Sequence, residues 1–315
     1  MPISVLVRIL DLDTLDCGPV PSTSTSTQRD IFRGSNLREG TFLPTRVFGG
    51  QLIGQALVAA SRTVPASQPV HSLHCSFLRP GSPAAPFLYL VDRTRDGSSF
   101  ATRQVTAQQH GEVVFRMTCS FHAPEARAFS HSVAMPADVP HPEDLPTQTS
   151  RLRQATSNPA LPAHVRSALV QRAELPFPLD FRQVVRPPST YAADTPASTR
   201  TCAWFKAPMM LPDDPALHRC VAAYGSDLAL LETALVPHRR PGHKGRLTSH
   251  MASLDHSMWF HAPFRADEWL LMEMESPAAS GGTGLATGRL WNSRGVLVAS
   301  VAQEGLIRPR PTAKL

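Results

Sequence analysis

Two long apolar stretches interrupt a chain in which hydrophobic and polar positions otherwise alternate. The first, residues 46–64, contains a pair of glycines near its start, continues for the length of a helix and stops at Pro65. The second, residues 223–236, stops in the same way at Pro237. Because both stretches carry few charges, the pattern predicts two buried helices.

Alternating segments follow the first apolar stretch from His71 onward. Turn signals separate these segments at residues 79–81, at Asp96-Gly97 and at His110-Gly111. This spacing is typical of antiparallel strands joined by hairpins. Two more strands are predicted at residues 179–185 and 201–207, shortly before the second helix.

The order of a helix followed by several strands occurs twice. When the two helices are aligned on their terminal Val-Pro, the strands that follow also match in order. The corresponding positions are Gln55 and Asp227, Ser72 and Ser253, and Cys119 and Gln303. The repeat predicts an α+β protein in which two antiparallel sheets each wrap around their own central helix.

The length of 315 residues also favours two domains, because a single core rarely grows beyond ~250–300 residues. The segment between the repeats is rich in proline and alanine and has no clear period. We therefore expect an N-terminal domain at residues 1–124, an interdomain linker at 125–175 and a C-terminal domain at 176–315.

Composition excludes several classes of protein. Hydrophobic residues make up 42% and charged residues 18%, as in a folded domain, and no apolar run approaches the ~20 residues of a membrane span. The five cysteines form no Cys-x-x-Cys pair, so we expect free thiols and no zinc site. The net charge of +6 comes without a basic run interleaved with aromatics, which makes nucleic acid a poor candidate partner.

Three polar residues of the second repeat stand where the first repeat has no ionisable group: Asp227, Ser253 and Gln303. A carboxylate could act as a general base, with a hydroxyl and an amide orienting a water molecule. A structural interpretation is also open, because an aspartate near the start of a helix is an ordinary N-cap. Ser253 and Gln303 are less specific still when taken singly.

Eight sequence blocks between Val47 and Arg308 resemble the acyl-CoA thioesterase II family. They are Val47–Leu57, His71–His74, Phe77–Gly81, Arg95–Phe100, Ser120–Pro124, Asp255–His261, Glu268–Leu271 and Gly295–Gly305. The resemblance implies a double hot-dog fold, an acyl-CoA substrate and an assembly of at least two chains. It also implies that Asp227, Ser253 and Gln303 hold the hydrolytic water, with no metal and no cofactor.

Other readings of these residues remain open. His256 and His261 could act as bases, although a histidine in a packed strand is usually a hydrogen-bonded structural group. The same scaffold could also serve an enoyl-CoA hydratase or dehydratase, or a non-catalytic acyl-CoA-binding protein. A serine hydrolase is disfavoured because the chain contains no Gly-x-Ser-x-Gly motif.

The last three residues, Ala313-Lys314-Leu315, are a variant of the peroxisomal Ser-Lys-Leu signal. The preceding Arg-Pro-Arg-Pro-Thr segment is typical of an exposed tail, which an import receptor needs. We therefore expect the receptor for peroxisomal import as a partner and the peroxisomal matrix, or the related glycosome, as the location. In a bacterial source the same ending would carry no meaning and the protein would be cytoplasmic.

Overall fold

The computed structural model describes residues 5–15, 29–39, 45–125, 129–157, 159, 161–184, 199–238 and 248–310. The C-terminal tripeptide lies outside these residues. The helical elements are α1 (Val5–Leu10), α2 (Gly49–Ser61), η1 (Pro142–Asp144), α3 (Gln148–Thr156), α4 (Ala163–Glu174), α5 (Pro215–Ser226) and η3 (Leu231–His238).

The strands of the first half are β1 (Asp13–Leu15), β2 (Arg29–Gly34), β3 (Val70–Phe77), β4 (Phe87–Asp96), β5 (Phe100–Gln109) and β6 (Glu112–His122). Those of the second half are β7 (Asp180–Val184), β8 (Arg200–Lys206), β9 (Thr248–Ser253), β10 (Asp255–Phe260), β11 (Leu270–Ser280), β12 (Thr283–Asn292) and β13 (Leu297–Pro309).

All these strands join one antiparallel sheet of thirteen within the described part of the chain. The order is β1-β2-β4-β5-β6-β3-β10-β13-β12-β11-β8-β7, with β9 beside β13. Outward from the central pair β3 and β10, the strands of the two halves follow in corresponding order: β6, β5, β4, β2 and β1 on one side, and β13, β12, β11, β8 and β7 on the other. The pair joins the halves directly, since Leu73 lies opposite Met258 in an antiparallel register.

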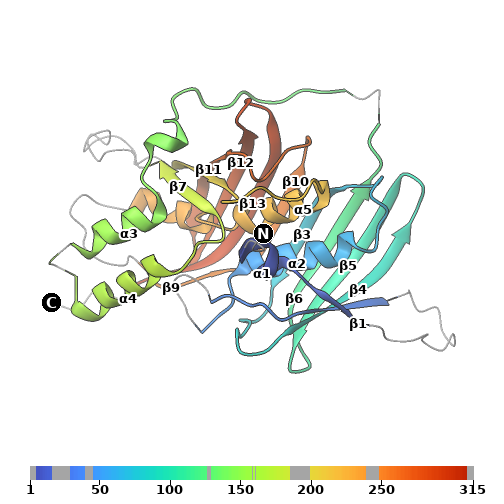
Figure 1. The fold of residues 1–315 in the computed structure, drawn as a ribbon, viewed down its shortest axis with the longest axis horizontal. Helices are drawn as coiled ribbons and strands as arrows, with labels where there is room; N and C mark the ends of the chain where they lie inside the picture. The colour runs from blue at the N-terminus through green and yellow to red at the C-terminus, as the bar shows by residue number, and fades with distance from the viewer. Residues whose placement is uncertain are drawn as a thin grey trace.

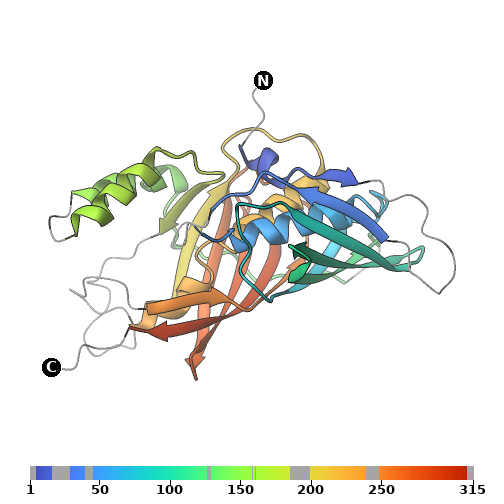
Figure 2. The same ribbon diagram turned by 90° about the horizontal axis from the view of Figure 1, so that it is seen from below.

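The sheet curves around two central helices, α2 from the first half and α5 from the second, which pack against each other (Figures 1 and 2). Ten of the thirteen residues of α2 are buried, including the polar Gln51 and Gln55. Helix α1 packs on α2. The predicted α+β architecture, with antiparallel strands wrapped around central helices, is therefore confirmed.

The second predicted helix is placed wrongly. The structure has α5 at Pro215–Ser226, a break, and a 3₁₀ segment over Leu231–His238, where a single helix was expected at residues 223–236. The overlooked start signal is Asp214-Pro215: the Asp214 side chain accepts a hydrogen bond from the Ala216 N–H, and proline occupies the first turn. Aligning the two helices on their Val-Pro ends is consequently wrong as well.

The predicted linker at residues 125–175 contains two helices that the sequence pattern did not reveal. Helices α3 and α4 pack against each other and lie at one end of the molecule next to β7 (Figure 1). Thr147 caps α3 by accepting a hydrogen bond from the Ser150 N–H. Because α3 contributes no buried residue, its sequence lacks the apolar stripe by which a helix is recognised.

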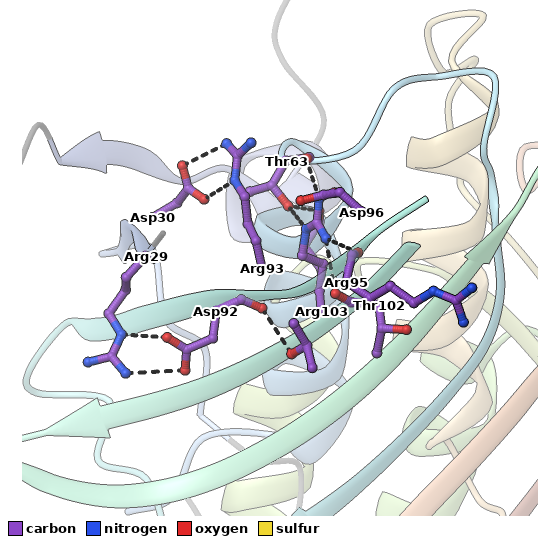
Figure 3. A network of polar contacts seen from close by, with 11 residues as sticks. Arg29, Asp30, Thr63, Asp92, Arg93, Arg95, Asp96, Thr102 and Arg103 are labelled. Atoms are coloured by element: carbon purple, nitrogen blue, oxygen red, sulfur yellow. Dashed lines mark hydrogen bonds and ion pairs between the residues drawn. The ribbon is translucent and has the colours of Figure 1, made fainter. Parts of the chain in front are cut away.

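A buried arginine ties the end of α2 to the β4–β5 hairpin (Figure 3). Arg103 is fully buried and donates to the hydroxyl and the carbonyl of Thr63 at 2.7 and 3.0 Å. It also donates to the carbonyls of Arg95 and Thr102 and to the carboxylate of Asp96. A buried guanidinium is tolerated when its donors are paired in this way.

The structure also describes the helices and most of the cysteines that bear on membrane spans and thiols. Among the described residues, no helix is long and apolar enough to cross a membrane. Four cysteines, at positions 75, 119, 202 and 220, are buried with free thiols, and Cys17 lies outside the described residues.

Candidate active site

A cavity of about 400 Å³ lies where the two halves meet. The first half lines it with the start of α2 and with residues 77–81 after β3. The second half contributes residues 227–229 after α5, residues 231 and 232 at the start of η3, and residues 251–254 at the end of β9. Asp227 and Ser253 are therefore in the wall of one cavity, although 26 positions separate them in the sequence.

Asp227 is the residue that ends α5. It occupies the C-cap position of that helix, so the expected position near a helix start, and its alternative role as an N-cap of the same helix, are both wrong. Ala229 has a φ of +62°, a left-handed conformation that turns the chain away from the helix direction. This turn leaves Asp227 and Leu228 facing the cavity.

The Asp227 carboxylate points at the N-terminus of the other central helix, α2. The backbone N–H of Gly50 donates a hydrogen bond to it, and a Cβ atom at Gly49 would lie 2.8 Å from its Oδ2. Glycine is therefore required at position 49 for the carboxylate to approach. The unpaired N–H groups and the dipole at a helix start both favour a negative charge there.

Gln303 joins the other two predicted site residues. Its side-chain Nε2 donates to Asp227 Oδ1 at 2.7 Å and to Ser253 Oγ at 2.8 Å. The Gln303 side chain is fully buried on β13, and its Oε1 has no hydrogen-bond partner in the described part of the chain. The structure thus brings Asp227, Ser253 and Gln303 together through these two hydrogen bonds.

The pKa of Asp227 is raised from its ordinary value of 3.8 to about 6. Burial is the main cause, because it disfavours the charged form. The hydrogen bonds from Gln303 and from the Gly50 N–H oppose this effect and stabilise the carboxylate. Asp227 is therefore ionised at neutral pH and more basic than an exposed aspartate.

The first-half residues paired with this trio by the repeat are not in the cavity wall. Gln55 is buried in the middle of α2, where it donates to the carbonyl of Ile9 and accepts from the Tyr89 hydroxyl. Ser72 and Cys119 are buried in the sheet, and burial raises the pKa of the Cys119 thiol. These three residues pack the first half.

Each of the two candidate histidines is hydrogen-bonded to a serine hydroxyl. His256 is fully buried, its Nε2 lies 2.9 Å from Ser226 Oγ, and burial lowers its pKa to about 4. His261 pairs with Ser300 Oγ at 2.9 Å. Neither contributes to the cavity wall, so the interpretation of both as structural groups fits their positions.

The sequence did not single out the Gly49-Gly50 pair or the two arginines at the cavity. The glycines were visible only as a glycine-rich helix entry, and their function depends on Asp227 lying opposite. Arg46 and Arg79 line the cavity, with Arg79 3.4 Å from the carboxylate of Glu112. Within the described ranges, no group of three or more potential metal ligands is found.

Comparisons with known protein families match both halves of the chain. The family described as "Acyl-CoA thioesterase N-terminal domain" matches residues 40–122. The family described as "Acyl-CoA thioesterase" matches residues 173–306.

Curated relatives resemble the chain over nearly its whole length. It is 43% identical over 311 residues to acyl-coenzyme A thioesterase 8 of Homo sapiens, covering 98% of this chain and 90% of the relative. Identity to acyl-CoA thioesterase 2 of Haemophilus influenzae is 37%, covering 88% and 92%. Identity to the peroxisomal acyl-coenzyme A thioester hydrolase 1 of Saccharomyces cerevisiae is 27%, covering 82% and 85%.

Solved structures agree on the fold. An acyl-CoA thioesterase II, TesB2, from Mycobacterium marinum is 41% identical, with a TM-score of 0.72 over 97% of this chain and 99% of that one. A hot-dog protein from Alicyclobacillus acidocaldarius, at 19% identity, has a TM-score of 0.66 over 98% of each chain. The double hot-dog fold expected from the sequence is thereby confirmed.

Proposed function

Because the chain belongs to the acyl-CoA thioesterase family, we propose that it hydrolyses fatty acyl-CoA thioesters through a water molecule held by Asp227, Ser253 and Gln303. One observation carries this proposal: the Gln303 amide bridges the Asp227 carboxylate and the Ser253 hydroxyl at the wall of the cavity. A carboxylate with a pKa of about 6 in this position is suited to general-base catalysis near neutral pH.

In the proposed reaction Asp227 takes a proton from the water as the water oxygen attacks the thioester carbonyl carbon. The C–S bond then breaks, the carbonyl re-forms as a carboxylic acid, and the proton held by Asp227 passes to the departing CoA sulfur. The products are a fatty acid and CoA, and the carboxylate is regenerated. No covalent acyl-enzyme is formed.

The remaining groups orient the water and stabilise the developing negative charge. Ser253 Oγ accepts from Gln303, so its own proton points elsewhere and can be donated to the water or the substrate. Gly49, at the first turn of α2, lines the same cavity, and its backbone N–H is our candidate donor to the carbonyl oxygen. Arg46 and Arg79 give this cavity the positive charge that CoA phosphates require.

The test is release of free thiol from acyl-CoA of increasing chain length, with separate identification of the fatty acid. We expect equal amounts of CoA and fatty acid, with Asp227→Asn inactive. Thiol release that is absent from folded protein across the panel would contradict the proposal.

The alternative hydratase or dehydratase chemistry needs a histidine placed for proton transfer at carbon. In the part of the chain that the structure describes, no histidine lines the cavity, and His256 is neutral and bonded to Ser226. A hydratase would convert enoyl-CoA to hydroxyacyl-CoA without releasing thiol, so the same assay distinguishes the two reactions. A non-catalytic acyl-CoA-binding protein would bind the substrates and leave them intact.

Import into peroxisomes is a separate proposal that rests on Ala313-Lys314-Leu315 and on the similarity to the yeast peroxisomal hydrolase. Deleting the tripeptide should leave thioesterase activity unchanged and move a fluorescently labelled protein, tagged at its N-terminus, from peroxisomes to the cytosol. Retention in peroxisomes after the deletion would place the targeting signal elsewhere in the chain.

Homo-oligomerisation and the domain limits at residues 124 and 176 also remain proposals. Light scattering tests the first, and limited proteolysis tests the second.

A further inference from the structure

A second cavity, of about 320 Å³, lies beside the catalytic one. It is enclosed by α3, by Arg172 of α4, by residues 177–183 at β7 and by Tyr224 of α5. The two cavities share Phe48, Leu228, Ala229 and Glu232 as lining residues. A ligand in the second cavity would therefore lie one layer of residues away from Asp227.

Two guanidinium groups meet in this cavity without a compensating anion. The Nη1 atoms of Arg38 and Arg172 are both shielded from solvent, and neither has a hydrogen-bond partner among the described residues. Each arginine has another contact that fixes it: Arg38 Nη2 donates to the Pro176 carbonyl at 2.8 Å, and the Arg172 guanidinium lies 4.2 Å above the ring of Phe177.

The two arginines are close enough to affect each other. Burial lowers the pKa of Arg172, and the positive charge of Arg38 lowers it further. Both arginines also oppose the rise that burial produces in the pKa of Tyr224, so its hydroxyl lies near both charges. Unpaired N–H groups and like charges at a shielded position are costly unless a ligand satisfies them.

Among the described residues, no other charged group of the cavity wall forms an ion pair with Arg38 or Arg172. Arg151 also lines the cavity and donates to the Gln183 carbonyl at 3.4 Å. Glu39 and Glu232 also line the cavity, but in the described ranges no carboxylate is within ion-pair distance of Arg38 or Arg172. The charged end of the cavity thus calls for an added anion.

The apolar side chains in the rest of the cavity wall indicate which kind of anion would bind. It is formed largely by aromatic and aliphatic side chains, among them Phe48, Leu152, Leu179 and Phe181. A phosphate would pair with the arginines but would gain little from such a wall, whereas an aliphatic chain would bury apolar surface there. Two adjacent guanidinium groups match the two oxygens of a carboxylate.

We propose that this second cavity binds a medium-chain aliphatic carboxylate, with the carboxylate on Arg38 and Arg172 and the hydrocarbon chain along the aromatic wall. The catalytic cavity is a poorer site for the same molecule because the Asp227 carboxylate repels a second negative charge. Free fatty acid, the class of product that the proposed reaction releases, has the required chemistry.

Equilibrium binding of decanoate to the full chain, measured by titration calorimetry, tests this assignment without requiring turnover. Arg38→Met and Arg172→Met remove one guanidinium each and keep an unbranched apolar side chain, so each should weaken decanoate binding by about tenfold or more. Arg166→Met, on the same helix but outside the cavity wall, is the matched control and should bind decanoate like the unmodified protein.

A comparison with the uncharged 1-decanol separates the contribution of the carboxylate to binding from that of the hydrocarbon chain. It should bind more weakly than decanoate, and Arg172→Met should leave its affinity unchanged. Thermal unfolding of each variant without ligand verifies folding, and since either arginine alone tests the site, one variant that fails to fold is replaced by the other.

Three results would overturn the assignment: decanoate that does not bind, decanoate affinity that is equal in all three variants, or displacement of decanoate by 3′,5′-ADP, which would assign the arginines to the phosphates of CoA. If the unmodified protein binds decanoate but shows no thioesterase activity, only the proposed function is contradicted. The two proposals therefore fail separately.

Discussion

Replacing Asp227 by asparagine should abolish catalysis and at the same time stabilise the fold. Asparagine has nearly the same shape but cannot accept a proton near neutral pH. If Asp227 is the general base, turnover should fall by about 10²-fold or more. In the unmodified enzyme, kcat/KM should decrease below about pH 6, as the raised pKa of Asp227 requires.

The stability effect follows from the same burial. A carboxyl pKa raised from 3.8 to about 6 means that ionising Asp227 costs the folded state about 3 kcal/mol relative to the unfolded chain. The sign is opposite to that of a salt-bridged aspartate. Below about pH 4 both states are protonated and nothing is lost, and stability decreases as the pH rises until the cost is complete above about pH 6.

Asparagine removes this cost but also a hydrogen-bond acceptor. The carboxylate accepts from Gln303 and from the Gly50 N–H, and the single oxygen of an amide satisfies these donors less well, at a cost of about 1 kcal/mol. The net gain at pH 8 should be about 2 kcal/mol, or an increase in Tm of about 3–6 °C.

The assay pairs steady-state thiol release with thermal unfolding at pH 8 and at pH 4, in the unmodified protein and in Asp227→Asn. Gln55→Ala is the control, since Gln55 is buried away from the cavity and its loss should reduce stability with little change in kcat. Turnover in Asp227→Asn equal to that in Gln55→Ala would refute the general-base role. A variant less stable than the unmodified protein at pH 8 would refute the desolvation argument.

Further changes test the rest of the site and the scaffold. Gln303→Ala should reduce kcat nearly as much as Asp227→Asn, and Ser253→Ala less, because a water can replace the hydroxyl; both are measured by thiol release. Gly49→Ala should reduce kcat, because its Cβ would lie 2.8 Å from Asp227 Oδ2. Arg103→Lys should lower the free energy of unfolding by about 2–4 kcal/mol in urea, with kcat retained. A chelator should leave activity intact; loss that a divalent ion restores would contradict the metal-free mechanism.

The sequence predicts those parts of the fold that carry a local period or a turn signal. Helix α2 and strands β3 to β6 lie where alternation and glycine turns indicate, because each is buried in a regular pattern. Helix α5 was misplaced because the apolar run continues past its end into η3, and only backbone geometry at Ala229 separates the two. Helix α3 was missed because it buries no residue.

The sequence predicts the three residues of the candidate site but not the contacts that hold them together. Asp227, Ser253 and Gln303 could be chosen because of the resemblance to family blocks, whereas the pairing of Asp227 with Gln55 in the repeat is not supported by the helix positions. Their hydrogen bonds depend on β13 lying next to β9, with Gly305 opposite Ser253, and on the end of α5 facing the start of α2. Such long-range neighbours leave no local signal in the sequence.

The position of Asp227 means that the candidate active site draws on both halves of the chain. The second half supplies the carboxylate, the hydroxyl and the amide, while the first half supplies the N-terminus of α2 through Gly49 and Gly50. Burial raises the pKa of this carboxyl, and the hydrogen bonds from Gln303 and then from the Gly50 N–H at the helix start oppose that rise. Among the described residues, the first half contributes no carboxylate to the cavity wall, and Gln55 is hydrogen-bonded to Tyr89 and to the Ile9 carbonyl inside its own half. The two halves of the chain thus contribute differently to the candidate site: the second half carries the proposed catalytic side chains, and the first half supplies the helix N-terminus and part of the cavity wall.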